Sequence, residues 1–196
     1  MVTVIVVGGP AGTGKTTQGV LLSQYYQCPF IEGDQLHPQS NIDKMSRGEA
    51  LTDEDRWGWL AQISKVASTK AQSDPSHLSV VSCSMLKRKY REYIKQQAAA
   101  AGGGGGPDIK FRFVFLYTNF DELMERVGAR VGHFMKSDMV RSQYEIMEIP
   151  HGGELLQNGG EAVAVDTSGK SRETIFKEVL GDFELPDEDK RQEPVK

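Results

Sequence analysis

Residues 2–17 decide the fold: they read Val2-Thr3-Val4-Ile5-Val6-Val7-Gly8 and then Gly9-Pro10-Ala11-Gly12-Thr13-Gly14-Lys15-Thr16-Thr17. The second part fits the pattern G-x-x-x-x-G-K-[ST] at every fixed position. Glycines at this spacing let backbone N–H groups and a helix N-terminus point at the oxygens of a polyphosphate. Lys15 adds positive charge, and the Thr16 hydroxyl can reach Mg²⁺. Residues 9–17 are therefore predicted to be a phosphate-binding loop (P-loop) that binds a nucleotide.

The residues on both sides of the loop suit this prediction. The apolar run 2–7 has the composition of a buried parallel strand, and residues 18–26 continue as a helix in spite of Gly19. The alternative is a chance match on a glycine-rich turn, in a chain that holds 21 glycines. A strand before the loop and a helix after it argue against that alternative.

Length and composition predict one domain. The 196 residues can bury a full core, so we expect a single domain over residues 1–184 and a disordered tail over 185–196. With 27 acidic and 23 basic residues the net charge is -4, so no overall field favours nucleic acid or an anionic membrane. Cys28 and Cys83 are too few for a disulfide framework, and no run reaches transmembrane length. We expect a cytoplasmic protein with no nucleic-acid or membrane partner.

Strands and helices alternate along the rest of the chain. Further strands are predicted at 28–32, 78–83, 111–117 and 162–166. Further helices are predicted at 53–72, 87–97, 121–130, 137–148 and 172–180, with Thr52 and Asn119 as caps. This alternation predicts an α/β three-layer sandwich, with a parallel sheet of about five strands and helices on both faces. The tract 98–106 contains five consecutive glycines and predicts a flexible surface insert.

Polar side chains follow the second strand. Residues 33–38 read Gly-Asp-Gln-Leu-His-Pro and lie at the carboxyl end of that strand, where ligands bind in open α/β sheets. A large ATPase would close its third strand with an acidic residue, but here that strand ends in Ser82-Cys83-Ser84. The carboxylate beside the phosphates must come from elsewhere, and Asp34 is its predicted source. A switch GTPase is excluded because the chain lacks the guanine-reading motif Asn-Lys-x-Asp.

Six motifs follow one another between residues 33 and 145, after the P-loop. They are Gly33-Asp34-x-Leu36-His37-Pro38, Asn41-Ile42-x-Lys44-Met45, Gly48-x-x-Leu51-x-Asp53-x-Asp55-Arg56-x-x-Trp59-Leu60, Cys83-Ser84-x-Leu86-Lys87-x-x-Tyr90-Arg91, Arg126-x-x-x-Arg130-x-Gly132-His133-Phe134 and Ser142-Gln143-Tyr144-Glu145. In these motifs the chain resembles the gluconokinases, small P-loop kinases related in fold to shikimate and adenylate kinases. The departures are Gly58 for a proline, Met135 and Tyr144 for phenylalanines, Met85 for a small residue, and the extra insert at 98–106. Met85 is the one departure expected to alter acceptor preference.

The resemblance implies phosphoryl transfer from ATP to the 6-hydroxyl of D-gluconate, giving 6-phosphogluconate for the pentose phosphate route. It implies a P-loop kinase fold with a substrate-binding segment at about 35–75 and a lid at about 130–142. Mg²⁺ is expected on Thr16, with Asp34 as a further ligand through water. Asp34 is also expected to accept the hydroxyl proton. A homodimer is left open.

Two arginines are candidates for closing over the phosphates. Arg126 and Arg130 lie one helical turn apart, just before a glycine-containing segment that can hinge as a lid. A loose phosphoryl-transfer transition state needs such positive charge. We therefore expect Arg130 to be catalytic together with Lys15 and Asp34, and Arg126 to bind the nucleotide. The alternative is that both arginines are solvated on a surface helix.

An aldonic acid also needs a cation for its carboxylate. Lys87, Arg91 and Arg56 are the candidates, and Lys87 is favoured because it is nearest the end of a strand. The alternative for the first two is a solvated basic helix. Asp53 and Asp55 are interpreted as helix-terminal charges, with Asp55 as a candidate partner for an arginine.

Short polar groups are needed for the hydroxyls of such a substrate. Ser84, His37 and His133 are the candidates, although the histidines are otherwise ordinary turn residues. Trp57 and Trp59 are interpreted as packing residues.

Two alternatives to a gluconokinase remain: another small-metabolite or nucleoside-monophosphate kinase of this fold, and a nucleotide-binding regulatory protein without catalysis.

Overall fold

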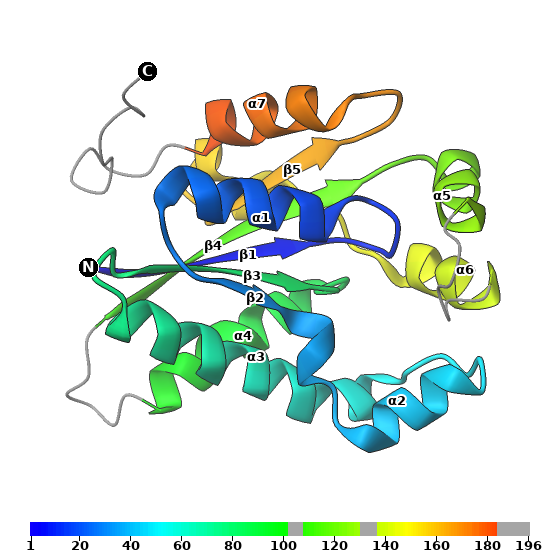
Figure 1. Ribbon diagram of the computed structural model, residues 1–196, viewed down its shortest axis with the longest axis horizontal. Coiled ribbons are helices and arrows are strands. Elements are labelled where there is room, and N and C mark those ends of the chain that lie inside the picture. Colours follow the sequence, from blue (N-terminus) through cyan, green and yellow to red (C-terminus); the bar gives the residue numbers. More distant parts are fainter. Residues whose placement is uncertain (102–107, 130–136, 184–196) are drawn as a thin grey trace.

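The computed structural model describes residues 1–101, 108–129 and 137–183. Its centre is a parallel sheet with the strand order β2-β3-β1-β4-β5, and every pairing is parallel (Figure 1). The strands are β1 (Val2–Gly8), β2 (Phe30–Glu32), β3 (Leu78–Cys83), β4 (Ile109–Tyr117) and β5 (Ala162–Asp166). The predicted five-stranded parallel sheet is therefore confirmed.

Helices cover both faces of the sheet, α1 and α7 on one face and α3 and α4 on the other (Figure 1). The helices are α1 (Lys15–Tyr26), α2 (Gln39–Ser46), α3 (Asp53–Ser73), α4 (Arg88–Ala101), α5 (Phe120–Gly128), α6 (Ser137–Ile146) and α7 (Arg172–Asp182). Three short 3-10 helices are η1 (Gly33–Leu36), η2 (Gly152–Glu154) and η3 (Leu156–Asn158). In the described part of the chain, no helix is long and apolar enough to cross a membrane.

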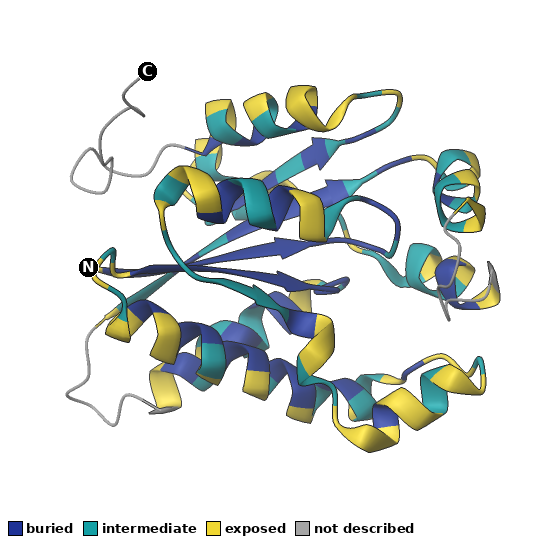
Figure 2. Cartoon of the chain, viewed as in Figure 1, coloured by how far each residue is buried: buried dark blue, intermediate teal, exposed yellow. Residues whose placement is uncertain are grey.

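The core has two layers because side chains alternate across the sheet. In β1, Val4 and Val6 belong to the cluster that contains residues of α3 and α4. Ile5 and Val7 belong to the cluster that contains residues of α1 and α7. Burial on both faces explains why the central strands are continuously apolar, and Figure 2 shows β1 as dark blue along its length.

The helix starts follow the predicted capping residues. The Thr52 side chain accepts a hydrogen bond from the Asp55 N–H, and the Asp55 side chain accepts from the Thr52 N–H, which forms a capping box at the start of α3. Asn119 Oδ1 accepts from the Glu122 N–H at 2.9 Å at the start of α5. Both predicted caps are confirmed, because such caps depend only on residues within one turn.

Two segments differ from the predictions. The helix expected to end at residue 97 continues through Ala101, and Ala98 is buried in the core, so the predicted loop 98–106 is wrong in its first four residues. Alanine has the strongest helix propensity, which explains the extension. Helix α2 was not predicted, since among its residues only Asn41 is buried. Residues 102–107 of the insert, residues 130–136 of the expected lid, and the expected tail lie outside the described residues.

Candidate active site

The P-loop owes its shape to glycines. Gly9, Gly12 and Gly14 have φ angles of +129°, +90° and +90°, which side chains rarely tolerate. A Cβ on Gly9 would lie 2.0 Å from the carbonyl oxygen of Leu116, and one on Gly12 would lie 2.8 Å from Val127 Cγ2. A Cβ on Gly14, the N-cap of α1, would meet nothing within 4 Å. The loop therefore packs closely against the end of β4 and against α5, with no room for side chains at Gly9 and Gly12.

The charge of this loop suits a polyphosphate. Lys15 is the first residue of α1, and its Nζ donates to the carbonyl oxygen of Pro10 at 3.0 Å. Thr13 Oγ1 donates to the same oxygen at 2.8 Å. The first turn of α1 contains no acidic residue, so the positive end of the helix dipole adds to the lysine charge.

Glu32 is a carboxylate that the sequence interpretation missed. It is the last residue of β2, and its Oε2 accepts from Thr16 Oγ1 at 2.7 Å. Ser82 Oγ donates to Glu32 Oε1, and the same hydroxyl accepts from the Gly33 N–H at 3.1 Å. The sequence signal for Glu32 is an acidic residue that ends a strand, two positions before Asp34.

Thr16 and Glu32 have the donor chemistry that Mg²⁺ prefers, because both offer hard oxygen atoms. Among the described residues, no three His, Cys, Asp or Glu side chains are grouped to hold a metal ion. A magnesium ion at Thr16 would therefore share its coordination with phosphate oxygens and water, as Mg²⁺ does in nucleotide sites.

A cavity of about 250 Å³ opens beside the P-loop at the carboxyl ends of the strands. It brings together six of the predicted site residues: Ala11, Lys15, Asp34, His37, Arg56 and Ser84. Side chains from α2, from the segment before α3 and from α6 complete the lining: Ile42, Met45, Ser46, Glu49, Ala50, Leu51, Met139, Ser142 and Gln143. The cavity thus joins the P-loop to four of the eight predicted acceptor residues: Asp34, His37, Arg56 and Ser84. Met85 does not line it but is buried against Gly8.

His37 is fixed in the cavity wall by packing. Its ring stacks on Trp59 with centroids 4.1 Å apart, and its Nδ1 lies 3.3 Å from Asn41 Nδ2. Burial lowers the pKa of His37 to about 4, so the imidazole is neutral at pH 7. Trp59 is fully buried and donates from Nε1 to the carbonyl oxygen of Gly33 at 2.8 Å, which confirms its packing role.

Arg56 is a buried cation that faces the cavity. It is 4% exposed, its Nη1 lies 3.5 Å from Ser84 Oγ, and its buried Nε has no hydrogen-bond partner. Within the described ranges, no carboxylate forms an ion pair with it. A buried charge without a counter-ion is costly. Arg56 is therefore suited to bind an anion that enters the cavity.

Lys87 and Arg91 do not line the cavity. Lys87 Nζ forms an ion pair with Asp53 Oδ1 at 2.8 Å, and the same carboxylate also accepts from Lys89. Arg91 is buried, with its Nη2 2.7 Å from Glu154 Oε1 and its Nη1 donating to a backbone carbonyl at 3.1 Å. The two side chains therefore hold α4 in place.

Asp55 has a different partner from the one predicted. Its Oδ2 pairs with Lys44 Nζ at 2.6 Å instead of with an arginine. The contact joins α2 to the start of α3.

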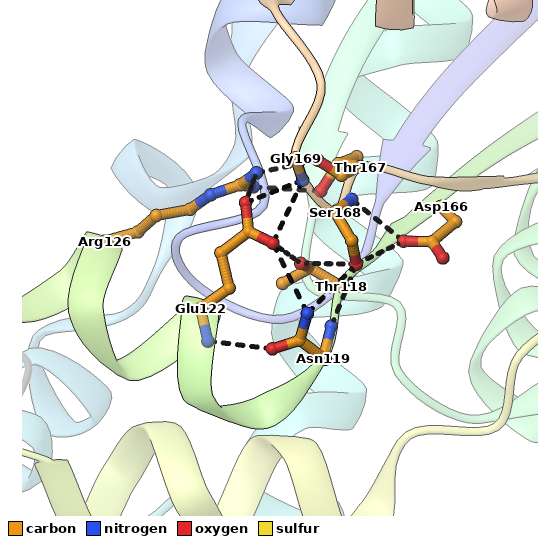
Figure 3. Close-up of polar contacts among 8 residues, drawn as sticks. All are labelled: Thr118, Asn119, Glu122, Arg126, Asp166, Thr167, Ser168 and Gly169. Carbon is orange, nitrogen blue, oxygen red and sulfur yellow. Dashed lines mark hydrogen bonds and ion pairs between the residues drawn. The ribbon is translucent and has the colours of Figure 1, made fainter.

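Arg126 is anchored on the loop that follows β5 (Figure 3). Its Nη1 donates to Thr167 Oγ1 at 2.9 Å, and its Nη2 donates to the Thr167 carbonyl oxygen at 2.7 Å and pairs with Glu122 at 2.5 Å. Glu122 also accepts from the Gly169 N–H at 3.1 Å, and this bond, with the contact to Arg126, lowers the pKa of Glu122. Arg126 therefore lies outside the cavity in this structure. Arg130 and His133 lie outside the described residues.

Comparison with known proteins shows which family the chain belongs to. The sequence model of the shikimate kinase family matches residues 11–184. A probable gluconokinase of Saccharomyces cerevisiae is 44% identical over 152 residues, which are 75% of each chain. The chain belongs to the gluconokinase family. The gluconokinase of Gluconobacter oxydans is 35% identical over 93% of this chain and 92% of its own. A gluconokinase structure from Sinorhizobium meliloti 1021 has a TM-score of 0.73 at 39% identity, covering 91% of this chain and 90% of that chain. The predicted family and the predicted P-loop kinase fold are confirmed.

Proposed function

We propose that the protein transfers the γ-phosphoryl group of ATP to the 6-hydroxyl of D-gluconate, giving ADP and 6-phospho-D-gluconate. The observation that carries this proposal is the single cavity that Lys15, Asp34 and Arg56 all line. It contains a phosphate-binding lysine, a carboxylate for the acceptor hydroxyl, and a buried cation for an acidic acceptor. The names of the relatives, gluconokinases, support gluconate as that acceptor.

On the donor side, residues 9–17 bind the phosphates of ATP. Thr16 would hold Mg²⁺, with Glu32 or Asp34 accepting from its water ligands. The ion, when bound, neutralises phosphate charge. Arg130 is proposed to close over the transferred group. Arg126, held at Thr167, is proposed to shape the nucleotide side of the site.

On the acceptor side, Arg56 binds the gluconate carboxylate, because two N–H groups of a guanidinium match two carboxylate oxygens. Neutral His37 and the Ser84 hydroxyl bond to the sugar-acid hydroxyls. Asp34 accepts the proton of the 6-hydroxyl as the oxygen attacks phosphorus. Lys87 could bind the gluconate carboxylate only if its ion pair with Asp53 broke. Arg56 is therefore the preferred ligand for that carboxylate.

The test is a coupled assay of ADP formation with ATP, Mg²⁺ and a panel of acceptors. The panel holds D-gluconate, other aldonic acids, shikimate and nucleoside monophosphates. We expect turnover with D-gluconate and a product phosphorylated at the 6-position. Turnover with a nucleoside monophosphate but not with gluconate would instead indicate a nucleoside-monophosphate kinase of this fold. Nucleotide binding without any turnover would support a regulatory protein.

A further inference from the structure

One side chain of α6 reaches the P-loop across the cavity. The Ala11 N–H donates to Gln143 Oε1 at 2.9 Å, between residues 132 positions apart in the chain. Both residues line the cavity that also contains Lys15 and Asp34. In Figure 1, α6 lies beside α5 at the carboxyl ends of the strands. This hydrogen bond therefore spans the place where a phosphate donor and an acceptor would meet.

The packing of α6 fixes the position of this carboxamide. Met139 and Val140 are buried, and the Tyr144 ring lies against Phe120 with centroids 5.1 Å apart. The Arg141 guanidinium lies 4.6 Å from the Phe120 centroid. Contacts on both sides of Gln143 thus tie α6 to α5, so the carboxamide is held at the P-loop by a packed helix.

The Ala11 amide needs an acceptor in any state of the site. A backbone N–H at a cavity wall that loses its partner binds water. Such a water would lie in the same cavity as Lys15 and the Asp34 carboxylate. Lys15 would attract the phosphates and Asp34 would accept a proton, so the water would be placed to replace the acceptor hydroxyl.

We propose, resting on the function proposed above, that Gln143 is a positioning residue that keeps water out of the transfer site by occupying the Ala11 amide. Without it, a water oxygen bonds to the γ-phosphorus of ATP. The bond from that phosphorus to the β,γ-bridging oxygen breaks, and its electron pair leaves with ADP. The proton of the water passes to Asp34. ATP is then hydrolysed to ADP and phosphate instead of phosphorylating the acceptor.

The uncharged carboxamide suits this role. It accepts from the Ala11 N–H without placing negative charge beside the phosphates. A glutamate at this position would keep an accepting oxygen but repel phosphate. An asparagine would keep the amide but end one methylene short. Substitutions at Gln143 can thus test three properties separately: the hydrogen bond to Ala11, the charge of the side chain and its length.

The test measures ADP formation without acceptor, and the ratio of ADP to 6-phosphogluconate with gluconate. We expect Gln143→Ala and Gln143→Asn to raise acceptor-free ADP formation about fivefold to tenfold, the effect of one lost hydrogen bond. The product ratio should rise above that of the wild type. Gln143→Glu should lower turnover while keeping the wild-type ratio. Gln62→Ala, on an exposed position of α3, should match the wild type.

A loss of helix packing alone would slow both reactions and leave the ratio unchanged. The inference is overturned if folded Gln143→Ala and Gln143→Asn show wild-type ratios, or if Gln143→Glu uncouples as they do. If the wild type does not phosphorylate gluconate, the proposed function fails. Acceptor-free ADP formation by the variants still decides the role of Gln143, because it requires no acceptor.

Discussion

Replacing Arg56 by methionine should weaken acceptor binding and stabilise the free protein at the same time. Methionine has similar reach but no charge, and the site is 4% exposed. In the free protein the guanidinium is buried without a carboxylate partner in the described structure. Its removal should therefore raise the free energy of unfolding by about 1 to 4 kcal/mol, the gain found when buried ion pairs are replaced by well-packed apolar residues.

The effect on gluconate has the opposite sign. Hydrogen bonds to a charged group contribute about 1.5 to 3 kcal/mol each, and two such bonds to the carboxylate would be lost. The KM for gluconate should rise at least about 100-fold, since about 1.4 kcal/mol is a factor of ten. The KM for ATP should change little, because the P-loop backbone and Lys15 set nucleotide binding.

The assay is steady-state kinetics with each substrate varied, together with urea unfolding of the free protein. Lys87→Met is the matched control: Lys87 is paired with Asp53 and does not line the cavity. We expect its KM for gluconate to stay within about threefold of the wild type, in line with a partly exposed ion pair. The assignment of the carboxylate to Arg56 would be refuted if Lys87→Met raised this KM as much as Arg56→Met, or if Arg56→Met left it unchanged.

Three further predictions follow from the site and the fold. Asp34→Asn should lower kcat about 10²- to 10⁴-fold, as for loss of a positioned general base, while ATP affinity measured by titration calorimetry persists; near-normal kcat would remove Asp34 from proton transfer. Burial lowers the pKa of His37 to about 4, so the unfolded chain binds the extra proton first, and stability should fall as pH drops from about 6.5 to about 4. Urea unfolding across that range should show a shallower loss in His37→Gln, and an unchanged slope would contradict the assignment. Ala98→Gly should reduce the free energy of unfolding by about 1 kcal/mol because Ala98 lies within α4, and no loss would contradict the extension of that helix.

Local patterns in the sequence predict much of the fold. The strands follow from apolar runs, and the P-loop follows from its glycines and Lys15. The start of α3 and the start of α5 follow from Thr52 and Asn119, because a cap needs only residues within one turn. The family motifs lie in the sequence as well, and the comparisons confirm the family that they predicted.

The partners of charged side chains do not follow from local patterns. Lys87 and Arg91 suggest a carboxylate site by their spacing, but their acidic partners come from 34 and 63 residues away. Arg56 is an arginine in a helix, as Arg91 is. Its burial without a counter-ion among the described residues marks it as the better anion ligand.

The sequence by itself determined the nucleotide loop, the alternation of strands and helices, and the family, because each depends on residues that are close along the chain. Tertiary structure alone decided which of these residues share one cavity. It joined Glu32 to Thr16, and Gln143 to Ala11 across 132 positions. The physical reason is that parallel strands bring their carboxyl ends to one edge of the sheet, so side chains distant in sequence become neighbours there.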